Sequence, residues 1–276
     1  MATSLSAAQI QSFRDNGVLF PFRVLDDAEV AAGLAVVAGI DARPDERKGL
    51  LLHKSHYVSR TLSDLCRHPR ILDAVEGVIG PNILVWGANF FLKEPRSDAY
   101  VSWHQDATYW GLEPSDIVTA WVALTPSTVE SGCMRVVPGT HKGGIMAHKE
   151  TWAQDNLLSR GQEIAVDVDL DKVVDVVLKP GEMSLHHVDI AHNSEPNRSA
   201  QRRIGFAIRY VGAQVKQAGG VRDKAMLVRG EDRWHHFDHE EGGTGEFLPA
   251  DMARHAASWG GTRLAPKPPG DAAKAS

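Results

Sequence analysis

The sequence has few cysteines, no long hydrophobic run and no excess of basic residues. Its two cysteines, Cys66 and Cys133, form no CxxC pair, which argues against a disulfide framework and against a cysteine-rich zinc site. No apolar run approaches the ~18 residues of a membrane helix, and the N-terminus lacks the basic start and apolar core of a signal peptide. The net charge of −5 provides no basic surface for nucleic acid. These absences predict a cytoplasmic protein that binds neither membrane nor nucleic acid.

The composition is that of an ordinary globular chain. With 276 residues, 43% of them hydrophobic and 24% charged, the sequence can bury a full core without help from disulfides. We expect a single domain over residues 1–263 and a disordered tail over 264–276, because the end "APKPPGDAAKAS" has low complexity. The expected oligomeric state is a monomer or a homodimer.

Local patterns divide the chain into a helical first part and a β-rich second part. Within about residues 1–80, Ser6–Gln9 is a capping box and Gly17 a helix stop, while "VLFPFRVL" predicts one short strand. Over 83–211, β-rich runs such as "ILVWGANFFLK" and "RRIGFAIRYV" are separated by proline and glycine turns. Strands without intervening helices predict a mainly β fold with flanking helices, in the form of an antiparallel sandwich or barrel. The stretch 142–162 interrupts the strands and is expected to be an insertion or lid.

The stretch "WHQDATYW" places two ionisable residues inside an aromatic run. Since successive strand residues point to opposite faces, His104 and Asp106 are predicted to share one face, and Trp103 and Gln105 the other. Taken alone, the pair is more typical of a histidine and an aspartate that satisfy each other in a sheet than of a metal site. The run "SLHHVDIAH" adds histidines for a third ligand. Two histidines and one carboxylate are the pattern for non-haem Fe(II) with open positions for O2.

The last strand candidate, "RRIGFAIRYV", has two different faces. One face is apolar, whereas the other carries Arg203, Gly205, Ala207 and Arg209. An arginine beside two very small residues predicts a cavity into which the guanidinium reaches, and a guanidinium is suited to gripping a carboxylate. The alternative is a sheet face exposed to solvent, which is reasonable for Arg202 and open for Arg209.

Taken together, these pieces resemble the phytanoyl-CoA dioxygenase-like (PhyH) family of Fe(II)/2-oxoglutarate-dependent oxygenases. The matching pieces include "GPNILVWGANFFLK", "WHQDATYWGLEPSDIVTAWVAL", "SGCMRVVPGTHKG" and "KPGEMSLHHVDIAHNSEPNRS". They come in the family's order and cover about residues 54–211. The resemblance implies a double-stranded β-helix, a cupin-like jelly roll, and an enzyme that uses Fe(II), 2-oxoglutarate and O2.

The resemblance also implies roles for individual residues. His104, Asp106 and His192 match the three iron ligands, and Arg203 matches the arginine that holds the far carboxylate of 2-oxoglutarate. Ser194 is implied to hydrogen-bond the same carboxylate. The remaining co-substrate positions of the family match Asn89, Trp121, Gln105 and Lys54.

The identity of the third ligand and the type of reaction depend on two further details. His187 lies close enough to His192 in the sequence to remain an alternative ligand, whereas His186 is expected to be structural. Related halogenating enzymes replace the carboxylate ligand with a small residue. Because Asp106 is present here, the resemblance implies hydroxylation or a related oxidation.

The resemblance does not identify the substrate. Arg160 and Arg209 favour an anionic molecule, although charged residues on a lid are at least as often solvated. The segment 221–260 carries no recognisable motif, and its histidines and acidic residues are expected to be surface groups. Candidate pocket residues lie in the insertion and before the first long strand: His148, Asn156, Arg160, Gln162, His53 and His56.

Two other functions fit parts of the pattern. A cupin-type metalloenzyme that does not use 2-oxoglutarate would need no arginine at the position of Arg203. A non-catalytic jelly-roll binding domain is expected to have lost at least one metal ligand. The residues therefore favour a dioxygenase that hydroxylates an unactivated C–H bond of a small molecule and releases succinate and CO2.

Overall fold

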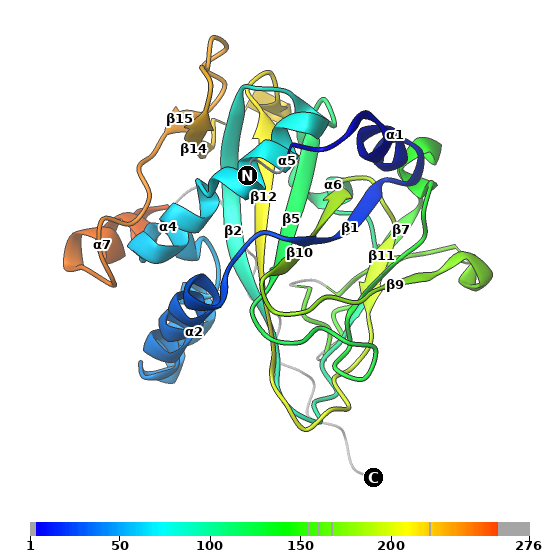
Figure 1. The fold of residues 1–276 in the computed structure, drawn as a ribbon, viewed down its shortest axis with the longest axis horizontal. Helices are drawn as coiled ribbons and strands as arrows, with labels where there is room; N and C mark the ends of the chain where they lie inside the picture. The colour runs from blue at the N-terminus through cyan, green and yellow to red at the C-terminus, as the bar shows by residue number, and fades with distance from the viewer. Residues whose placement is uncertain (1–3, 154, 159–160, 167, 221, 259–276) are drawn as a thin grey trace.

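Two β-sheets face each other, and helices cover the outer face of the larger sheet (Figure 1). Trp121 and Ala207 of the larger sheet and Met134 and Val136 of the smaller one belong to a single buried cluster between the sheets. The predicted mainly β fold with flanking helices, a double-stranded β-helix, is confirmed. The structure is a computed structural model, and it describes residues 4–153, 155–158, 161–166, 168–220 and 222–258.

The strands pair antiparallel, except for β14 and β15, which run parallel. The larger sheet has the order β1 (Val18–Arg23), β10 (Glu182–His187), β5 (Ile117–Ala123), β12 (Arg203–Gly212), β2 (Ile83–Lys93), β14 (Lys224–Arg229) and β15 (Asp238–His239). The smaller sheet has the order β3 (Val101–His104), β11 (His192–Ser194), β6 (Met134–Val136) and β9 (Val174–Val176). Two short ribbons pair β4 (Leu112–Glu113) with β13 (Lys216–Gln217) and β7 (His148–Glu150) with β8 (Gln162–Ile164).

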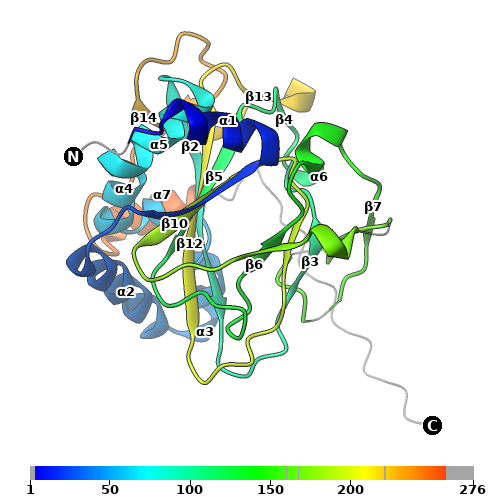
Figure 2. The same ribbon diagram turned by 45° about the vertical axis from the view of Figure 1, so that its right-hand side comes forward.

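Most of the helices precede the first long strand, and they lie on the side of the large sheet away from β3 and β6 (Figure 2). Within the described ranges, no helix is both long enough and apolar enough to cross a lipid bilayer. The α-helices are α1 (Ala7–Asn16), α2 (Asp27–Asp41), α3 (Asp45–Leu51), α4 (Arg60–Cys66), α5 (Pro69–Ile79), α6 (Ala107–Trp110) and α7 (Pro249–Ala257).

Helix α1 begins and ends at the residues that the sequence predicts. The Ser6 side chain accepts a hydrogen bond from the backbone N–H of Gln9, and the Gln9 side chain accepts one from the backbone N–H of Ser6. Gly17 ends the helix with a φ of 74°, a left-handed conformation that glycine adopts without steric cost. The chain then enters β1, which pairs with β10 at one edge of the large sheet.

Strand β12 has the two faces that its sequence predicts. Its apolar residues Ile204, Phe206, Ile208 and Tyr210 are buried in the core between the sheet and the helices. The opposite face turns toward the small sheet, where Ala207 joins the buried cluster between the sheets. The period of two along the strand therefore separates a helix-facing core from the inner face of the jelly roll.

Gly205 allows the Trp121 ring to pack closely against β12. A Cβ atom at Gly205 would come within 1.8 Å of the Trp121 ring, a contact that only movement of the ring could relieve. We expect Gly205→Ala to lower the free energy of unfolding by about 3 kcal/mol through overpacking. Chemical denaturation measures this change. Gly87→Ala on the neighbouring strand is the control, because its nearest contact would be an ordinary 3.8 Å; equal effects of the two substitutions would contradict the prediction.

Two segments whose structure the sequence does not predict add strands to the jelly roll. The insertion over 142–162 contributes the ribbon of β7 and β8, and β8 packs against β3. The segment 221–260 adds β14 and β15 to the edge of the large sheet. It is not simply surface, because Phe237 is 1% exposed and Asp232 is also buried. The tail predicted over 264–276 lies outside the described residues.

Candidate active site

A cavity of about 400 Å³ lies between the two sheets. This volume falls within the range of small-molecule sites. The inner face of β12 lines it, as its pattern of arginine and small residues predicts. The described residues whose side chains carry most of the chemistry of the lining are Lys54, Asn89, His104, Asp106, Trp121, His192, Ser194, Arg203, Arg209 and Asp223.

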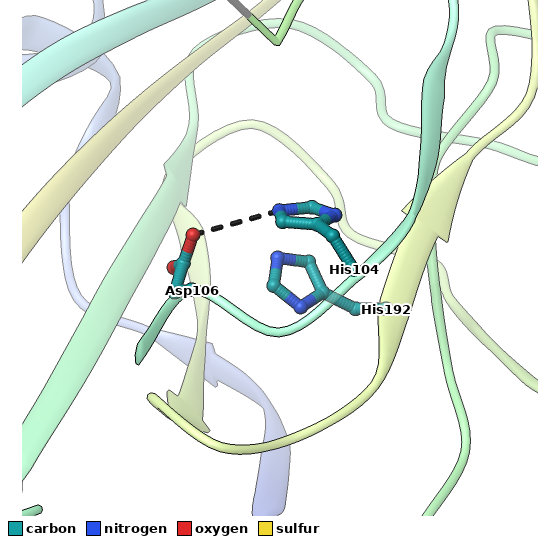
Figure 3. Close-up of side chains that lie close together, drawn as sticks. All are labelled: His104, Asp106 and His192. Atoms are coloured by element: carbon teal, nitrogen blue, oxygen red, sulfur yellow. Dashed lines mark ion pairs between the residues drawn. The ribbon is translucent and has the colours of Figure 1, made fainter. Parts of the chain in front are cut away.

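Two histidines from neighbouring strands face one aspartate in this cavity (Figure 3). His192 of β11 pairs in register with His104 of β3, and their ring centroids lie 4.1 Å apart. Each Nδ1 lies beside a backbone carbonyl oxygen, that of Ser102 at 2.9 Å and that of Ile190 at 3.0 Å. Donation from Nδ1 leaves Nε2 as the atom for a metal. One ligand atom from each of His104, Asp106 and His192 lies within 4.8 Å of the other two.

Asp106 reaches the two histidines by a different route from the one that strand alternation predicts. Strand β3 ends at His104, and Asp106 has helical φ and ψ angles of −58° and −40° immediately before α6. The turn still brings Asp106 Oδ1 to 3.5 Å from His104 Nε2. The two side chains converge as predicted, but the reason given by strand alternation is wrong. The chain leaves the sheet between His104 and Asp106.

Gln105 holds this turn from outside the cavity. Its side-chain amide donates to the carbonyl oxygens of Asp189 at 2.6 Å and Gly144 at 3.0 Å, and its Oε1 accepts from the backbone N–H of Met146 at 2.7 Å. The residue is fully buried and does not line the cavity. The structure therefore does not bring Gln105 together with the other residues predicted to contact the co-substrate.

Electrostatics favour a charged carboxylate at Asp106. Burial alone raises the pKa of Asp106, but the hydrogen bond from His104 and the nearby charges of His192, His104 and Arg209 bring it below its usual range. Burial, reinforced by His104, lowers the pKa of His192 well below its usual value. One carboxylate oxygen and two imidazole nitrogens form a donor set that fits Fe(II).

Of the three clustered histidines, His192 is the one that meets His104 and Asp106. The His187 ring instead packs near Phe13 and His141, and its Nδ1 accepts a hydrogen bond from the backbone N–H of Asp189 at 3.1 Å. His186 also lines the cavity, with its ring centroid 5.1 Å from that of His192. The metal-ligand cluster found among the described residues contains neither His186 nor His187.

Two arginines of β12, Arg203 and Arg209, line the cavity. Arg203 is the one that lies farther from the triad. It is 2% exposed, and its Nη1 donates to the carbonyl oxygen of Gly132 at 2.5 Å. Its Nε is buried without a hydrogen-bond partner, and its guanidinium lies 5.3 Å from the Trp121 ring centroid. Burial lowers the pKa of Arg203 to about 10, so that it remains charged at neutral pH. A buried donor without a partner is costly, which favours an anion at this position.

Lys93 belongs to this region, although it is not among the site residues predicted from the sequence. It lies opposite Arg203 in the register of β2 and β12 and is 1% exposed. Its Nζ donates to the Ser194 hydroxyl at 2.7 Å, to the Ser194 carbonyl oxygen at 3.1 Å and to the carbonyl oxygen of Glu195, and burial lowers the pKa of Lys93 to about 6. The signal in the sequence is the alternation of "NFFLK", which puts Lys93 on the same face as Asn89 and Phe91.

Asn89 and Lys54 lie toward the other end of the cavity from Arg203. Asn89 accepts a hydrogen bond from the backbone N–H of Lys54 at 3.0 Å. The Lys54 ammonium lies 3.9 Å from Asp223, which also accepts a hydrogen bond from the Trp86 indole N–H at 2.8 Å. Asp223 belongs to the segment without a motif, so only the folded chain reveals it as part of the cavity wall.

The predicted substrate pocket is only partly assembled from the insertion. Gln162 lines the cavity together with Leu157 and Leu158. His148 and Asn156 instead hold the local structure, because His148 accepts from the backbone N–H of Gln105 and Asn156 donates to the Ser102 hydroxyl. The candidate Arg160 lies outside the described residues. On the N-terminal side, His53 lines the cavity and His56 does not.

His56 makes folding stability depend on pH. It is fully buried, and burial lowers its pKa to about 3. The unfolded chain binds a proton at His56 near pH 6.5, whereas the folded chain binds it only near pH 3. The free energy of unfolding is therefore highest above pH 6.5 and decreases as the pH falls toward 3. Between pH 7 and 5 the loss from this group is about 2 kcal/mol. His56→Phe should flatten the decline in denaturation measurements, with His235→Gln at an exposed histidine as the control; an unchanged decline would refute the prediction.

The fold and the cavity together define a class of protein. A double-stranded β-helix that places two histidines, one aspartate and a buried arginine in one cavity is that of an Fe(II)/2-oxoglutarate-dependent oxygenase. The chain belongs to the phytanoyl-CoA dioxygenase (PhyH) family, whose sequence profile matches residues 13–205. Fe(II) and 2-oxoglutarate are the cofactors of this class.

Curated relatives agree with this family. The chain is 32% identical over 164 residues to a probable alpha-ketoglutarate-dependent hypophosphite dioxygenase of Stutzerimonas stutzeri, an alignment that covers 58% of this chain and 56% of that protein. It is 27% identical over 236 residues to human peroxisomal phytanoyl-CoA dioxygenase, covering 76% of this chain and 69% of that one. The chain thus spans little more than half the length of the first of these relatives.

Solved structures share the whole architecture. The non-heme monooxygenase ThoJ in its apo form superposes with a TM-score of 0.82 at 34% identity, over 92% of this chain and 95% of that one. CytC3 with Fe(II) and alpha-ketoglutarate superposes with a TM-score of 0.66 at 24% identity, over 90% and 98%. The second likeness concerns the fold alone, whereas the first extends to the sequence.

Proposed function

We propose that the protein hydroxylates an unactivated C–H bond of a small molecule, with Fe(II) held by His104, Asp106 and His192. The observation that carries the proposal is a single cavity that contains both this triad and the buried guanidinium of Arg203. The unpartnered Nε of Arg203 supports a bound carboxylate at that end, and the donor set of the triad supports Fe(II).

Different residues of the cavity bind different parts of the co-substrate. Iron and 2-oxoglutarate, when bound, supply the oxidising chemistry, in which O2 is consumed and succinate and CO2 are released. Arg203 and the Ser194 hydroxyl bind the far carboxylate of 2-oxoglutarate. Because Lys93 donates to Ser194 Oγ, the hydroxyl proton of Ser194 is free to donate to that carboxylate. Asn89 and Trp121 border the rest of the co-substrate.

Gln105 and Lys54 are the two other residues that the resemblance assigns to the co-substrate. Gln105 lies outside the cavity, so the proposal gives it a positioning role for the turn between His104 and Asp106. Lys54 lines the cavity, but its ammonium pairs with Asp223 at the end away from Arg203, and its contact with 2-oxoglutarate remains a prediction.

Each of the two alternative functions fails to explain one observed feature of the cavity. A cupin-type metalloenzyme without 2-oxoglutarate would bury the Arg203 guanidinium and leave its Nε unpartnered for no gain. A non-catalytic binding domain would have no need for a complete set of two histidines and one carboxylate within 4.8 Å. The presence of Asp106, where halogenating relatives lack a carboxylate, supports hydroxylation.

Succinate production by the purified protein tests the proposed function. With Fe(II), ascorbate and 2-oxoglutarate under air, we expect succinate to form only when both iron and co-substrate are present. A panel of small molecules should contain fractions that stimulate this turnover and so begin to identify the substrate. Asp106→Ala is the matched negative control. No turnover by the iron-loaded protein, and no visible charge-transfer band with 2-oxoglutarate under anaerobic conditions, would refute the co-substrate assignment.

A further inference from the structure

Arg209 is a charged group of the cavity to which the proposed function gives no role. It points from β12 into the cavity, in the row that Gly87 of β2 and Thr119 of β5 share. Its Nε is buried without a hydrogen-bond partner, and no described residue forms a hydrogen bond or ion pair with its guanidinium. Its guanidinium lies 4.9 Å from the ring centroid of Trp110, and the charge of Asp106 also acts on it without a direct ion pair. Burying a guanidinium without a hydrogen-bonded partner costs free energy, and an anion bound to it would offset that cost.

The position of Arg209 separates it from the predicted co-substrate tail. Arg203 and Arg209 lie on the same face of β12, six residues and therefore about 20 Å apart along the strand. The row of Arg209 also contains His186, whose ring centroid is 5.1 Å from that of His192. Arg209 thus lies beside the triad, whereas Arg203 lies at the far end of the cavity.

The charges around the cavity do not balance without a further anion. The charged residues lining it within the described chain are Arg203, Arg209 and Lys54 on the positive side and Asp106 and Asp223 on the negative side. With each histidine counted in the neutral form that binds a metal, this lining carries one net positive charge. Fe(II) and the 2-oxoglutarate dianion cancel each other, so the loaded site keeps that charge. A single negative charge on the substrate would neutralise it.

Aromatic rings border the same end of the cavity. The ring centroids of Trp86 and Trp110 lie 5.2 Å apart, and Tyr109 also lines the cavity. The Trp86 N–H is already bonded to Asp223, and the rings of Trp86 and Trp110 both line the cavity as apolar surface. Arg209 therefore combines a free guanidinium with an apolar wall, the arrangement that recognises a carboxylate attached to an apolar body.

We propose that Arg209 binds a carboxylate of a monoanionic substrate whose apolar part packs against Trp86 and Trp110. This inference rests on the proposed function, because the charge balance counts Fe(II) and 2-oxoglutarate. Arg209 acts as a specificity-determining residue. It selects an anion and brings it next to the triad, while Arg203 holds the co-substrate.

Binding of three matched probes tests the proposal. Phenylacetate, phenylacetamide and phenethylamine share a ring and differ in charge, and anaerobic calorimetry on the protein loaded with Fe(II) and 2-oxoglutarate measures their affinities. We expect phenylacetate to bind at least tenfold more tightly than the other two, which corresponds to about 1.4 kcal/mol. In Arg209→Gln this preference should fall below about threefold, while the affinity for 2-oxoglutarate stays within about threefold of the wild-type value. Arg233→Gln, which removes an exposed arginine, is the control for net charge.

Each other outcome counts against the assignment in its own way. Equal binding of the three probes, or binding of none of them, overturns it. A variant Arg209→Gln that keeps the preference for phenylacetate but loses 2-oxoglutarate would show that Arg209 serves the co-substrate. If the wild-type protein forms no charge-transfer band with Fe(II) and 2-oxoglutarate, the proposed function fails, and the charge balance behind this inference fails with it.

Discussion

His192→Ala is expected to weaken Fe(II) binding at least about 100-fold, whereas His187→Ala should retain it. The reason is geometric: a ring nitrogen of His192 belongs to the cluster with His104 and Asp106, while the His187 ring lies outside the cavity against Phe13 and His141. Loss of one of three protein ligands leaves a site that cannot hold the metal against water. Anaerobic titration with Fe(II), followed by removal of unbound metal and measurement of bound iron, gives the two affinities.

The pair of substitutions is matched, because both remove a histidine from the stretch around β10 and β11. Denaturation of each apo-variant separates a loss of folding from a loss of ligand. If His187→Ala lost iron and His192→Ala kept it, with both variants folded, the third ligand would be His187 and the proposed triad would be wrong.

Arg203→Met should lower the affinity for 2-oxoglutarate at least about 30-fold and leave Fe(II) binding intact. The guanidinium is buried and keeps an unpartnered donor in the cavity, so a bound carboxylate would form charge-assisted hydrogen bonds there that methionine cannot replace. Methionine retains much of the side-chain volume and limits the cavity that the substitution leaves. Titration of the charge-transfer band with 2-oxoglutarate at saturating Fe(II) under anaerobic conditions measures the effect.

Arg202→Met is the control, because Arg202 is the adjacent residue and its side chain pairs with Asp41 and Glu94 away from the cavity. It should bind 2-oxoglutarate as the wild-type protein does. An Arg203→Met protein whose affinity stays within about threefold of the wild-type value would remove Arg203 from the co-substrate site.

The sequence predicts the fold well where a local rule decides it. The capping box and Gly17 set the ends of α1 because hydrogen bonds within a few residues determine them. The alternation of β12 predicts both its helix-facing core and its inner face, since one buried face fixes the register of a strand. In the segment 221–260 no such rule operates, and the pairing of β14 with β2 depends on the sheet that is already formed.

For the candidate site, the sequence by itself determined the residue types: two histidines, one carboxylate and an inward arginine, the chemistry that Fe(II) and a carboxylate co-substrate require. Only the tertiary structure decided how they meet. It places His192 rather than His187 beside His104, because strand pairing between β3 and β11 is a long-range contact. It turns Asp106 out of the sheet toward them and pairs Lys54 with Asp223, 169 positions further along the chain. Spacing in the sequence carries no information about such contacts, since the packing of the two sheets creates them.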